Sequence, residues 1–374
     1  RWLLGAGALA AVALAMAVRG ARPRPAPARP AQAPAAMPRG DARRTDSATH
    51  ELYLRGRHAF HNRIADDGVR QASRYFAEAV ARDPDFAPAH AGLADAYTRM
   101  AAFGYADPPP TLRLAKEAAR RAVALDPALA AGHVALAHAL LLGDCAWDAA
   151  EREFRHAHAL DPTYAFGRAP FAMLLLGRGR HDEALAQLDT ARAAEPLAPW
   201  VANVRGRVLV SAGRPDEAIQ VLEEALTLYP GLDLAHQQLG HAYLARRMPD
   251  RAVAAFRRGA ALHGARDSAQ LAYAYAVTGD RAAARRIVRR LTAPSRPAHG
   301  PTGPSALAYH IAMAYAGLGE HDVALDWLER ARMGGALCPI PAAVEPGFRA
   351  LHASPRWRLL LSRMGLPVRS TEAR

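Results

Sequence analysis

Histidine and cysteine are the residues of this 374-residue sequence that could most readily bind a metal or act as nucleophiles. There are sixteen histidines and two cysteines. His58 and His61 would lie on one face of a helix, but two ligands do not make a metal site without further partners. Two cysteines also exclude a disulfide scaffold and a four-cysteine zinc site. The sequence therefore predicts no metal centre.

Motifs typical of active sites do not occur in the sequence. It contains no GxxxxGK[ST] loop, no GxSxG elbow, no HExxH pair and no strand-borne GxGxxG. We therefore expect no enzyme activity and no cofactor.

Positive charge is the most pronounced chemical feature of the chain. The net charge is +13, of which residues 246–296 carry +9 and residues 1–48 carry +6. Five arginines lie on one predicted helix and are called the basic patch: Arg281, Arg285, Arg286, Arg289 and Arg290. No aromatic residues alternate with these arginines to stack on bases, so nucleic-acid binding is not supported. An acidic protein partner, an anionic lipid surface or plain solubility fits the patch.

Prolines at a regular spacing show which elements position these residues. Pro84, Pro127, Pro162, Pro196 and Pro230 each end a helical pattern, at separations of 43, 35, 34 and 34 residues. A period of 34 residues is that of the tetratricopeptide repeat, a helix–turn–helix unit.

Small and bulky residues recur at fixed places within each predicted unit. First (A) helices carry a bulky residue, a small residue and then an aromatic residue or Leu, as in Leu239, Gly240 and Tyr243. Second (B) helices carry Ala, a bulky residue and a small residue, as in Ala218, Leu222 and Ala225. The predicted fold is an all-α, right-handed superhelical solenoid of about eight repeats. The repeats are 49–82, 87–125, 130–160, 165–195, 199–229, 233–263, 265–292 and 305–333.

Four segments make up the predicted organisation. They are an apolar helix (1–19), a disordered Pro/Ala/Arg-rich linker (20–48), the solenoid (49–334) and C-terminal capping helices (335–368). In an extended solenoid Cys145 and Cys338 lie far apart, so we expect each to be a buried or isolated thiol.

Motifs from the first repeat to the C-terminus resemble one bacterial family. They include YLRGRH at 53–58, YFAEAVARDP at 75–84, WDAAEREF at 147–154 and SPRW at 354–357. Residues 50–367 resemble the tetratricopeptide C-terminal region of membrane-anchored winged-helix transcriptional regulators and adenylate-cyclase-like proteins. The resemblance implies a cytoplasmic output domain before a single transmembrane helix, with the repeats beyond it.

Concave surfaces of such repeats usually bind extended peptides. Counting from the prolines gives the candidate partner-binding residues Trp200, Asn203, Arg207, Gln237, Gln238, His241 and Tyr309, with His138 and His310 beside them. Asn203 and Arg207 lie one turn apart and could hold a peptide carboxylate and its backbone.

Residues 2–18 form an uncharged run that could meet a membrane. The run is either a transmembrane anchor or a signal peptide with a cleavage site at Ala15-Met16-Ala17. We expect an anchor in a single-pass membrane protein. The resemblance puts the repeats in the periplasm, whereas the arginines after the run favour the cytoplasm.

The predicted function is a protein–protein interaction scaffold, the sensing or partner-binding part of a membrane-anchored regulator. The alternatives are the regulatory half of a cyclase or kinase whose catalytic domain lies upstream of Arg1, and a secreted scaffold.

Overall fold

The structure, a computed structural model, describes residues 46–62, 66–102, 104–196, 198–263, 265–293, 307–333 and 342–366. The chain divides into two compact units, Arg1–Arg44 and Thr45–Arg374. Every described residue belongs to the second unit, and the described residues form helices and turns without a strand. The predicted all-α solenoid is confirmed.

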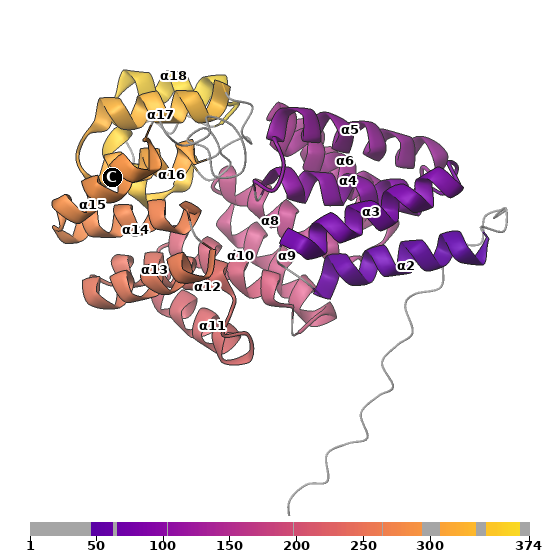
Figure 1. The fold of residues 1–374 in the computed structure, drawn as a ribbon, viewed down its shortest axis with the longest axis horizontal. Coiled ribbons are helices and arrows are strands. Elements are labelled where there is room, and N and C mark those ends of the chain that lie inside the picture. Colours follow the sequence, from indigo (N-terminus) through magenta and orange to yellow (C-terminus); the bar gives the residue numbers. More distant parts are fainter. Residues whose placement is uncertain are drawn as a thin grey trace, which may run out of the picture. The chain divides into compact units, whose positions relative to one another are not determined.

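The described helices follow one another in antiparallel pairs, an A helix and then a B helix (Figure 1). The pairs are α2 (Ser47–Asn62) with α3 (Asp66–Arg82), α4 (Ala87–Ala102) with α5 (Pro108–Leu125), α6 (Ala130–Asp144) with α7 (Trp147–Leu160), α8 (Arg168–Gly177) with α9 (His181–Ala194), α10 (Pro199–Ser211) with α11 (Pro215–Leu228), α12 (Asp233–Ala245) with α13 (Pro249–His263), α14 (Ala265–Thr278) with α15 (Arg281–Leu291), and α16 (Ala308–Gly317) with α17 (His321–Met333). A short 3₁₀ helix, η1 (Ala165–Gly167), precedes α8. The A helices contact one another between repeats, as α10 does with α8 and α12, so they form the inner, concave layer.

Close approach within each pair explains the predicted pattern of small and bulky residues. Ala218 and Leu222 of α11 are fully buried, and a Cβ on Gly206 of α10 would lie 2.8 Å from Leu222 Cδ1. A Cβ on Gly240 would lie 2.6 Å from Phe256 Cε2 in the next pair. Small A-helix residues therefore let the bulky B-helix side chain fill the space between the two helices.

Turns between the A and B helices use a left-handed residue. Gly179, Gly213, Gly279 and Gly319 have φ between 73° and 103°. Cys145 (φ 50°) and Arg247 (φ 56°) occupy the equivalent place between α6 and α7 and between α12 and α13. A side chain is strained in this conformation, so these two turns are less favourable than the glycine turns.

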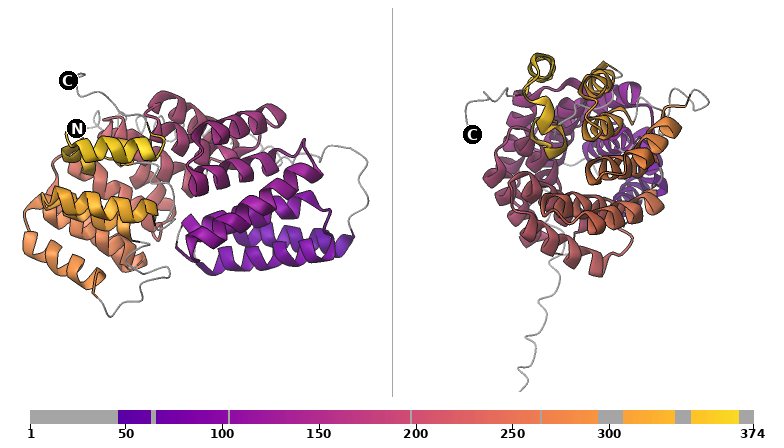
Figure 2. Two further views of the ribbon diagram at one scale, coloured as in Figure 1. Left: turned by 90° about the horizontal axis from the view of Figure 1, so that it is seen from above. Right: turned by 90° about the vertical axis from the view of Figure 1, so that its left-hand side faces the viewer.

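The last described residues of the chain return to the third repeat. The C-terminal elements are η2 (Ala342–Val344), η3 (Pro346–Leu351) and α18 (Pro355–Arg363). They contact the last repeat, since η3 packs on α16 and α17. The yellow helix α18 packs beside α17 (Figure 2). Beyond α18, the Met364 carbonyl accepts a hydrogen bond of 2.8 Å from Trp147 Nε1 of α7. Both side chains are buried, so the superhelix turns far enough to bring its C-terminal end against α7.

This return overturns the prediction of an isolated thiol at Cys145. Cys145 is disulfide-bonded, and the sequence has one other cysteine, Cys338, which lies outside the described residues. The prediction assumed an extended solenoid, whereas the chain end passes beside this turn: a Cβ on Gly365 would lie 3.7 Å from the Cys145 carbonyl oxygen.

The apolar helix predicted at 1–19 and the linker predicted at 20–48 lie outside the described residues, except for the last three positions of the linker. In the part of the chain that the structure describes, no helix combines the length and apolar character needed to cross a membrane.

Candidate peptide-binding groove

One position of the A helices gathers chemically active side chains on the concave face. It is the residue that follows the small residue of the A-helix pattern. Along the chain this position holds Arg57, Asp95, His138, Met173, Arg207, His241, Tyr273 and Met313. The register was visible in the sequence, but the prediction counted inner positions only from the fifth repeat, with His138 and His310 beside them. It therefore missed Arg57, Asp95 and Tyr273.

Several predicted partner-binding residues meet around one carboxylate. Glu345, between η2 and η3, is 7% exposed. Its Oε2 lies 3.4 Å from Arg207 Nη2 of α10 and 3.5 Å from the Tyr309 hydroxyl of α16. Arg207 was predicted to hold a peptide carboxylate, and the carboxylate it meets belongs to its own chain.

Burial controls the ionisation of the neighbouring groups. It raises the pKa of Tyr309 well above its ordinary value, and the charge of Glu345 adds to this effect. Burial also lowers the pKa of His241, against the opposing charge of Glu345. At neutral pH the site therefore holds a neutral phenol, a neutral imidazole and the Arg207 cation around the Glu345 carboxyl group.

Amide side chains form the rest of the predicted set on α10 and α12. Gln237 and Gln238 are 2% and 6% exposed, and Gln270 Nε2 donates to Gln237 Oε1 at 2.7 Å. Asn203 Oδ1 is buried and accepts no hydrogen bond from the described residues. The predicted Asn203–Arg207 pair therefore does not bind one carboxylate together, because only Arg207 contacts Glu345.

The backbone around Glu345 is held closely on both sides. We call residues 342–351 the return segment. Ser211 Oγ donates to the Val344 carbonyl at 3.3 Å. A Cβ on Gly347 would lie 3.0 Å from Met313 Cγ and 3.2 Å from the Tyr273 hydroxyl. The return segment therefore fills the concave face between α10 and α16, which we call the C-terminal groove.

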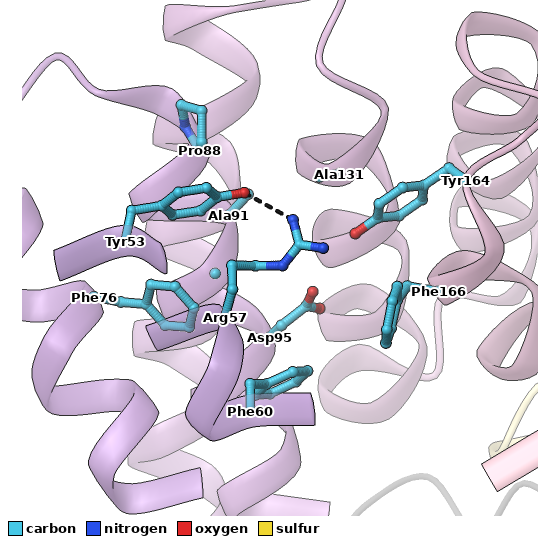
Figure 3. Close-up of a pocket in the computed structure, with 11 residues that line it drawn as sticks. Tyr53, Arg57, Phe60, Phe76, Pro88, Ala91, Asp95, Ala131, Tyr164 and Phe166 are labelled. Atoms are coloured by element: carbon cyan, nitrogen blue, oxygen red, sulfur yellow. Dashed lines mark hydrogen bonds between the residues drawn. The ribbon is translucent and has the colours of Figure 1, made fainter. Parts of the chain in front are cut away.

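A second concave region, the N-terminal pocket, lies between α2, α4, α6 and η1 (Figure 3). Its lining is mostly aromatic and apolar: Tyr53, Phe60, Phe76, Pro88, Ala91, Gly92, Ala131, Tyr164 and Phe166, together with Arg57 and Asp95. The predicted residue Trp200 borders this pocket instead of the C-terminal groove, since its ring lies 5.7 Å from that of Phe166.

Charges in the N-terminal pocket are poorly solvated. Arg57 Nη1 donates to the Tyr53 hydroxyl at 2.9 Å. Burial raises the pKa of Asp95 to about 7, although the charges of Arg99 and Arg57 act against it. Burial and the charge of Arg99 together lower the pKa of His138 to about 4. The pocket therefore contains a carboxylate that is half ionised near neutral pH.

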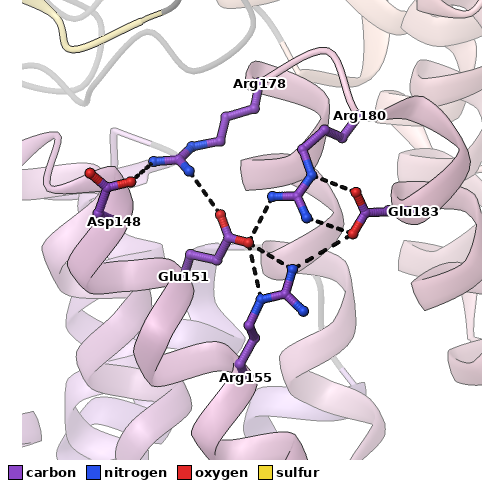
Figure 4. Close-up of polar contacts among 6 residues, drawn as sticks. All are labelled: Asp148, Glu151, Arg155, Arg178, Arg180 and Glu183. Carbon is purple, nitrogen blue, oxygen red and sulfur yellow. Dashed lines mark hydrogen bonds and ion pairs between the residues drawn. The ribbon is translucent and has the colours of Figure 1, made fainter.

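A network of charged side chains joins the third repeat to the fourth (Figure 4). Glu151 of α7 accepts hydrogen bonds from Arg155 at 2.8 Å, Arg178 at 2.9 Å and Arg180 at 2.7 Å. Burial alone raises the pKa of Glu151, but the hydrogen bonds from Arg180 and Arg155 outweigh it and the pKa lies below its usual value. Asp148 and Glu183 complete the network through Arg178 and Arg180. It is structural, because every charge has a partner.

The basic patch lies on the exposed face of α15, away from the concave layer. Two of its arginines contact the following turn: Arg281 donates to the Leu318 carbonyl, and Arg285 pairs with Glu320 at 2.9 Å. Arg286, Arg289 and Arg290 form no ion pair with the described residues. The structure therefore leaves three cations of the patch open to solvent.

Metal-ligand residues do not cluster in the ranges that the structure describes, where no group of three His, Cys, Asp or Glu side chains could hold an ion.

Comparisons with known proteins identify the repeat. Residues 170–233 and 209–270 match two sequence models of the tetratricopeptide repeat. No curated protein matches the chain.

Solved structures share the fold at low sequence identity. The anaphase-promoting-complex hetero-tetramer Cut9–Hcn1 is 17% identical, with 84% of this chain and 54% of that chain covered and a TM-score of 0.54. The human IFIT1 dimer with m7Gppp-AAAA is 14% identical, with 79% and 69% covered and a TM-score of 0.53. PilW, a type IV pilus biogenesis factor, is 20% identical, with 56% and 93% covered and a TM-score of 0.46. The chain therefore contains tetratricopeptide repeats in a solenoid fold.

Proposed function

We propose that this solenoid is a protein-interaction scaffold that binds an extended segment of a partner along its concave face. We further propose that it is the partner-sensing part of a membrane-anchored bacterial regulator and has no catalytic role of its own. The resemblance of its motifs to those regulators and the apolar run at residues 2–18 support the second proposal.

One observation carries the scaffold proposal: the concave face already accommodates a short, non-α-helical stretch of chain. Glu345 sits between two short 3₁₀ helices with its carboxylate against Arg207 and Tyr309. A surface that packs around irregular chain in this way has the chemistry to bind an extended peptide from another protein.

The disulfide at Cys145 supports a place for the repeats outside the cytoplasm. Disulfides form and persist in oxidising compartments such as the periplasm. Of the two orientations that the sequence allows, we therefore propose the periplasmic one, with residues 2–18 as the anchor. The basic patch would then be available to an acidic partner on the exposed face of α15.

Site-specific photocross-linking in the source cells tests the scaffold proposal. A photoreactive residue replaces Trp200 on the concave face, and the matched control replaces Leu228, which is 60% exposed at the end of the B helix α11. We expect a partner protein to be cross-linked from position 200 and not from position 228. Equal cross-linking from both positions, or none from position 200, would contradict the proposal.

Sequencing the gene upstream of Arg1 tests the regulator proposal separately. We expect an encoded winged-helix segment before the apolar run. A cyclase or kinase domain there would instead support the enzyme-linked alternative.

A further inference from the structure

We propose that the C-terminal groove takes a partner peptide in which an acidic residue is followed, three positions later, by an aromatic residue, and that the return segment is its built-in competitor. The proposal deepens the scaffold function above and rests on it. The occupant is a segment of a protein partner that carries an acidic and an aromatic residue, because the return segment shows how such a segment fits the groove.

The carboxylate position is defined by Arg207 and Tyr309. Their donor atoms lie 3.4 Å and 3.5 Å from Glu345 Oε2. Charge-assisted hydrogen bonds from a guanidinium to a carboxylate are usually about 2.7–2.9 Å long. Glu345 therefore occupies the site without making the shortest contacts that Arg207 can offer, and a separate peptide, free of the constraints of the chain, could approach more closely.

The aromatic position lies three residues beyond the carboxylate. Phe348 is fully buried, and its ring meets that of Tyr309 edge-to-face at 5.4 Å and 88°. Trp357 of α18 lies on the other side of Phe348 at 5.8 Å. An aromatic side chain is thus enclosed by aromatic rings from two elements, which selects for such a residue in a ligand.

The residue before the aromatic position has little room for a side chain. A Cβ on Gly347 would meet the side chains of Met313 and Tyr273 at 3.0 Å and 3.2 Å. The recognised pattern is therefore an acidic residue, any residue, Gly and an aromatic residue, as in Glu345-Pro346-Gly347-Phe348.

Competition follows from the covalent connection between the return segment and the groove. A tethered ligand has an effective concentration in the millimolar range, so a free peptide binds only to the fraction of molecules whose groove is open. The return segment is held on both sides. On its C-terminal side the Met364 carbonyl accepts a hydrogen bond from Trp147. On its N-terminal side Cys338 is the other cysteine of the sequence, and Cys145 is disulfide-bonded.

Fluorescence anisotropy on the full chain tests the proposal. The probe is a dye-labelled peptide of residues 342–352 (AAVEPGFRALH). Its matched control peptide has Gln in place of Glu. The protein is compared as wild type and as Glu345→Gln, an isosteric change that weakens the return segment while Phe348 still fills its position.

We expect the probe to bind Glu345→Gln at least about tenfold more tightly than wild type, since the groove opens more often. The Gln control peptide should lose about tenfold in affinity, and adding Arg207→Ala to Glu345→Gln should remove the difference between the two peptides. Equal binding of the probe to wild type and Glu345→Gln, or equal binding of both peptides, would overturn the proposal.

Failure of this inference is distinguishable from failure of the scaffold function. A partner cross-linked from position 200 together with equal affinities in the anisotropy assay would overturn the inference and leave the scaffold proposal standing. Circular dichroism and thermal melting of each variant confirm that the compared proteins are folded. Should Glu345→Gln melt early, Glu345→Asp replaces it, because that change shortens only the carboxylate side chain of the return segment, leaves Arg207 and Tyr309 of the groove intact and should also favour the probe.

Discussion

The two halves of the concave face place charged side chains at the same A-helix position but surround them differently. In the N-terminal pocket this position holds Arg57 and Asp95, and the Asp95 carboxylate accepts no hydrogen bond from the described residues. In the C-terminal groove it holds Arg207, which meets Glu345 of the return segment at 3.4 Å. The repeat therefore delivers polar groups to the inner face of most units, and other parts of the chain decide how closely these groups are paired.

The cost of burying an inner carboxylate appears as a pKa shift. Asp95 has its pKa raised to about 7 because burial outweighs the nearby arginines. We infer that the buried Asp95 carboxylate lowers the stability of the fold at the N-terminal pocket. In the C-terminal groove, the return segment supplies a partner for part of the polar groups.

Changes at the same core position of the repeat should affect both halves alike. Ala72 of α3 and Ala218 of α11 are fully buried at the same place in the B-helix pattern. Ala72→Glu and Ala218→Glu would each bury a charge and overpack the helix pair, and we expect each to lower the free energy of unfolding by about 4 kcal/mol or more. Urea unfolding measures this. The control is Ala254→Glu, an exposed position of α13 with Arg257 and Arg258 one turn away, with an expected effect below about 0.5 kcal/mol. A core variant that unfolds like this control would show that the repeat register is wrong in that half.

Asp95→Asn should reveal the instability of the N-terminal pocket. The raised pKa means that the unfolded state loses the Asp95 proton near pH 4 and the folded state only near pH 7. Ionisation therefore destabilises the wild type as pH rises through this window. The shift of about three units predicts that Asp95→Asn is more stable by about 4 kcal/mol at pH 8 and by less at pH 5. Denaturant unfolding at the two pH values measures the difference in the free energy of unfolding. If the stability gain of Asp95→Asn over the wild type does not grow with pH, the Asp95 carboxylate does not destabilise the N-terminal pocket.

The disulfide at Cys145 should stabilise the closed arrangement in which the chain end meets α7. Cys145→Ser should lower the free energy of unfolding by about 2–4 kcal/mol. A reducing agent should lower the melting temperature of the wild type and leave that of Cys145→Ser unchanged. If reduction affects both proteins equally, the bond does not hold the two halves together.

Arg247→Gly should stabilise the turn between α12 and α13. Arg247 has φ 56°, a left-handed conformation that strains its side chain. The four equivalent turns with glycine have no side chain to strain. We expect a gain of about 0.5–1 kcal/mol from relief of this strain. Thermal melting at matched concentration measures it, with Arg246→Gly, one residue earlier and at negative φ, as the control that should lose stability.

The basic patch should contribute to association and little to folding. We expect Arg285→Gln, Arg286→Gln, Arg289→Gln and Arg290→Gln together to change stability by less than about 1 kcal/mol, since exposed ion pairs such as Arg285–Glu320 contribute little. If an acidic partner binds there, a pull-down with the wild type should weaken steeply with salt and a pull-down with the quadruple variant should not. Identical partners and identical salt profiles would leave the patch without a binding role.

Local patterns in the sequence were sufficient to predict the helices and the core. Proline spacing predicted the helix pairs, and small residues such as Gly240 marked where two helices touch. These features depend on interactions within one or two repeats, so nearby residues determine them.

Long-range closure was decided only by the tertiary structure. The sequence identified Arg207 as a residue that could hold a carboxylate, but it did not show that Glu345 would supply one. It also predicted an isolated thiol at Cys145, since a linear count of repeats places the third repeat far from the C-terminus. The difference has a physical cause: a small rotation from each repeat to the next accumulates along the solenoid, and no local pattern records its sum. The accumulated rotation brings the chain end to Trp147 and the return segment to Arg207, and so determines which polar groups of the concave face have partners.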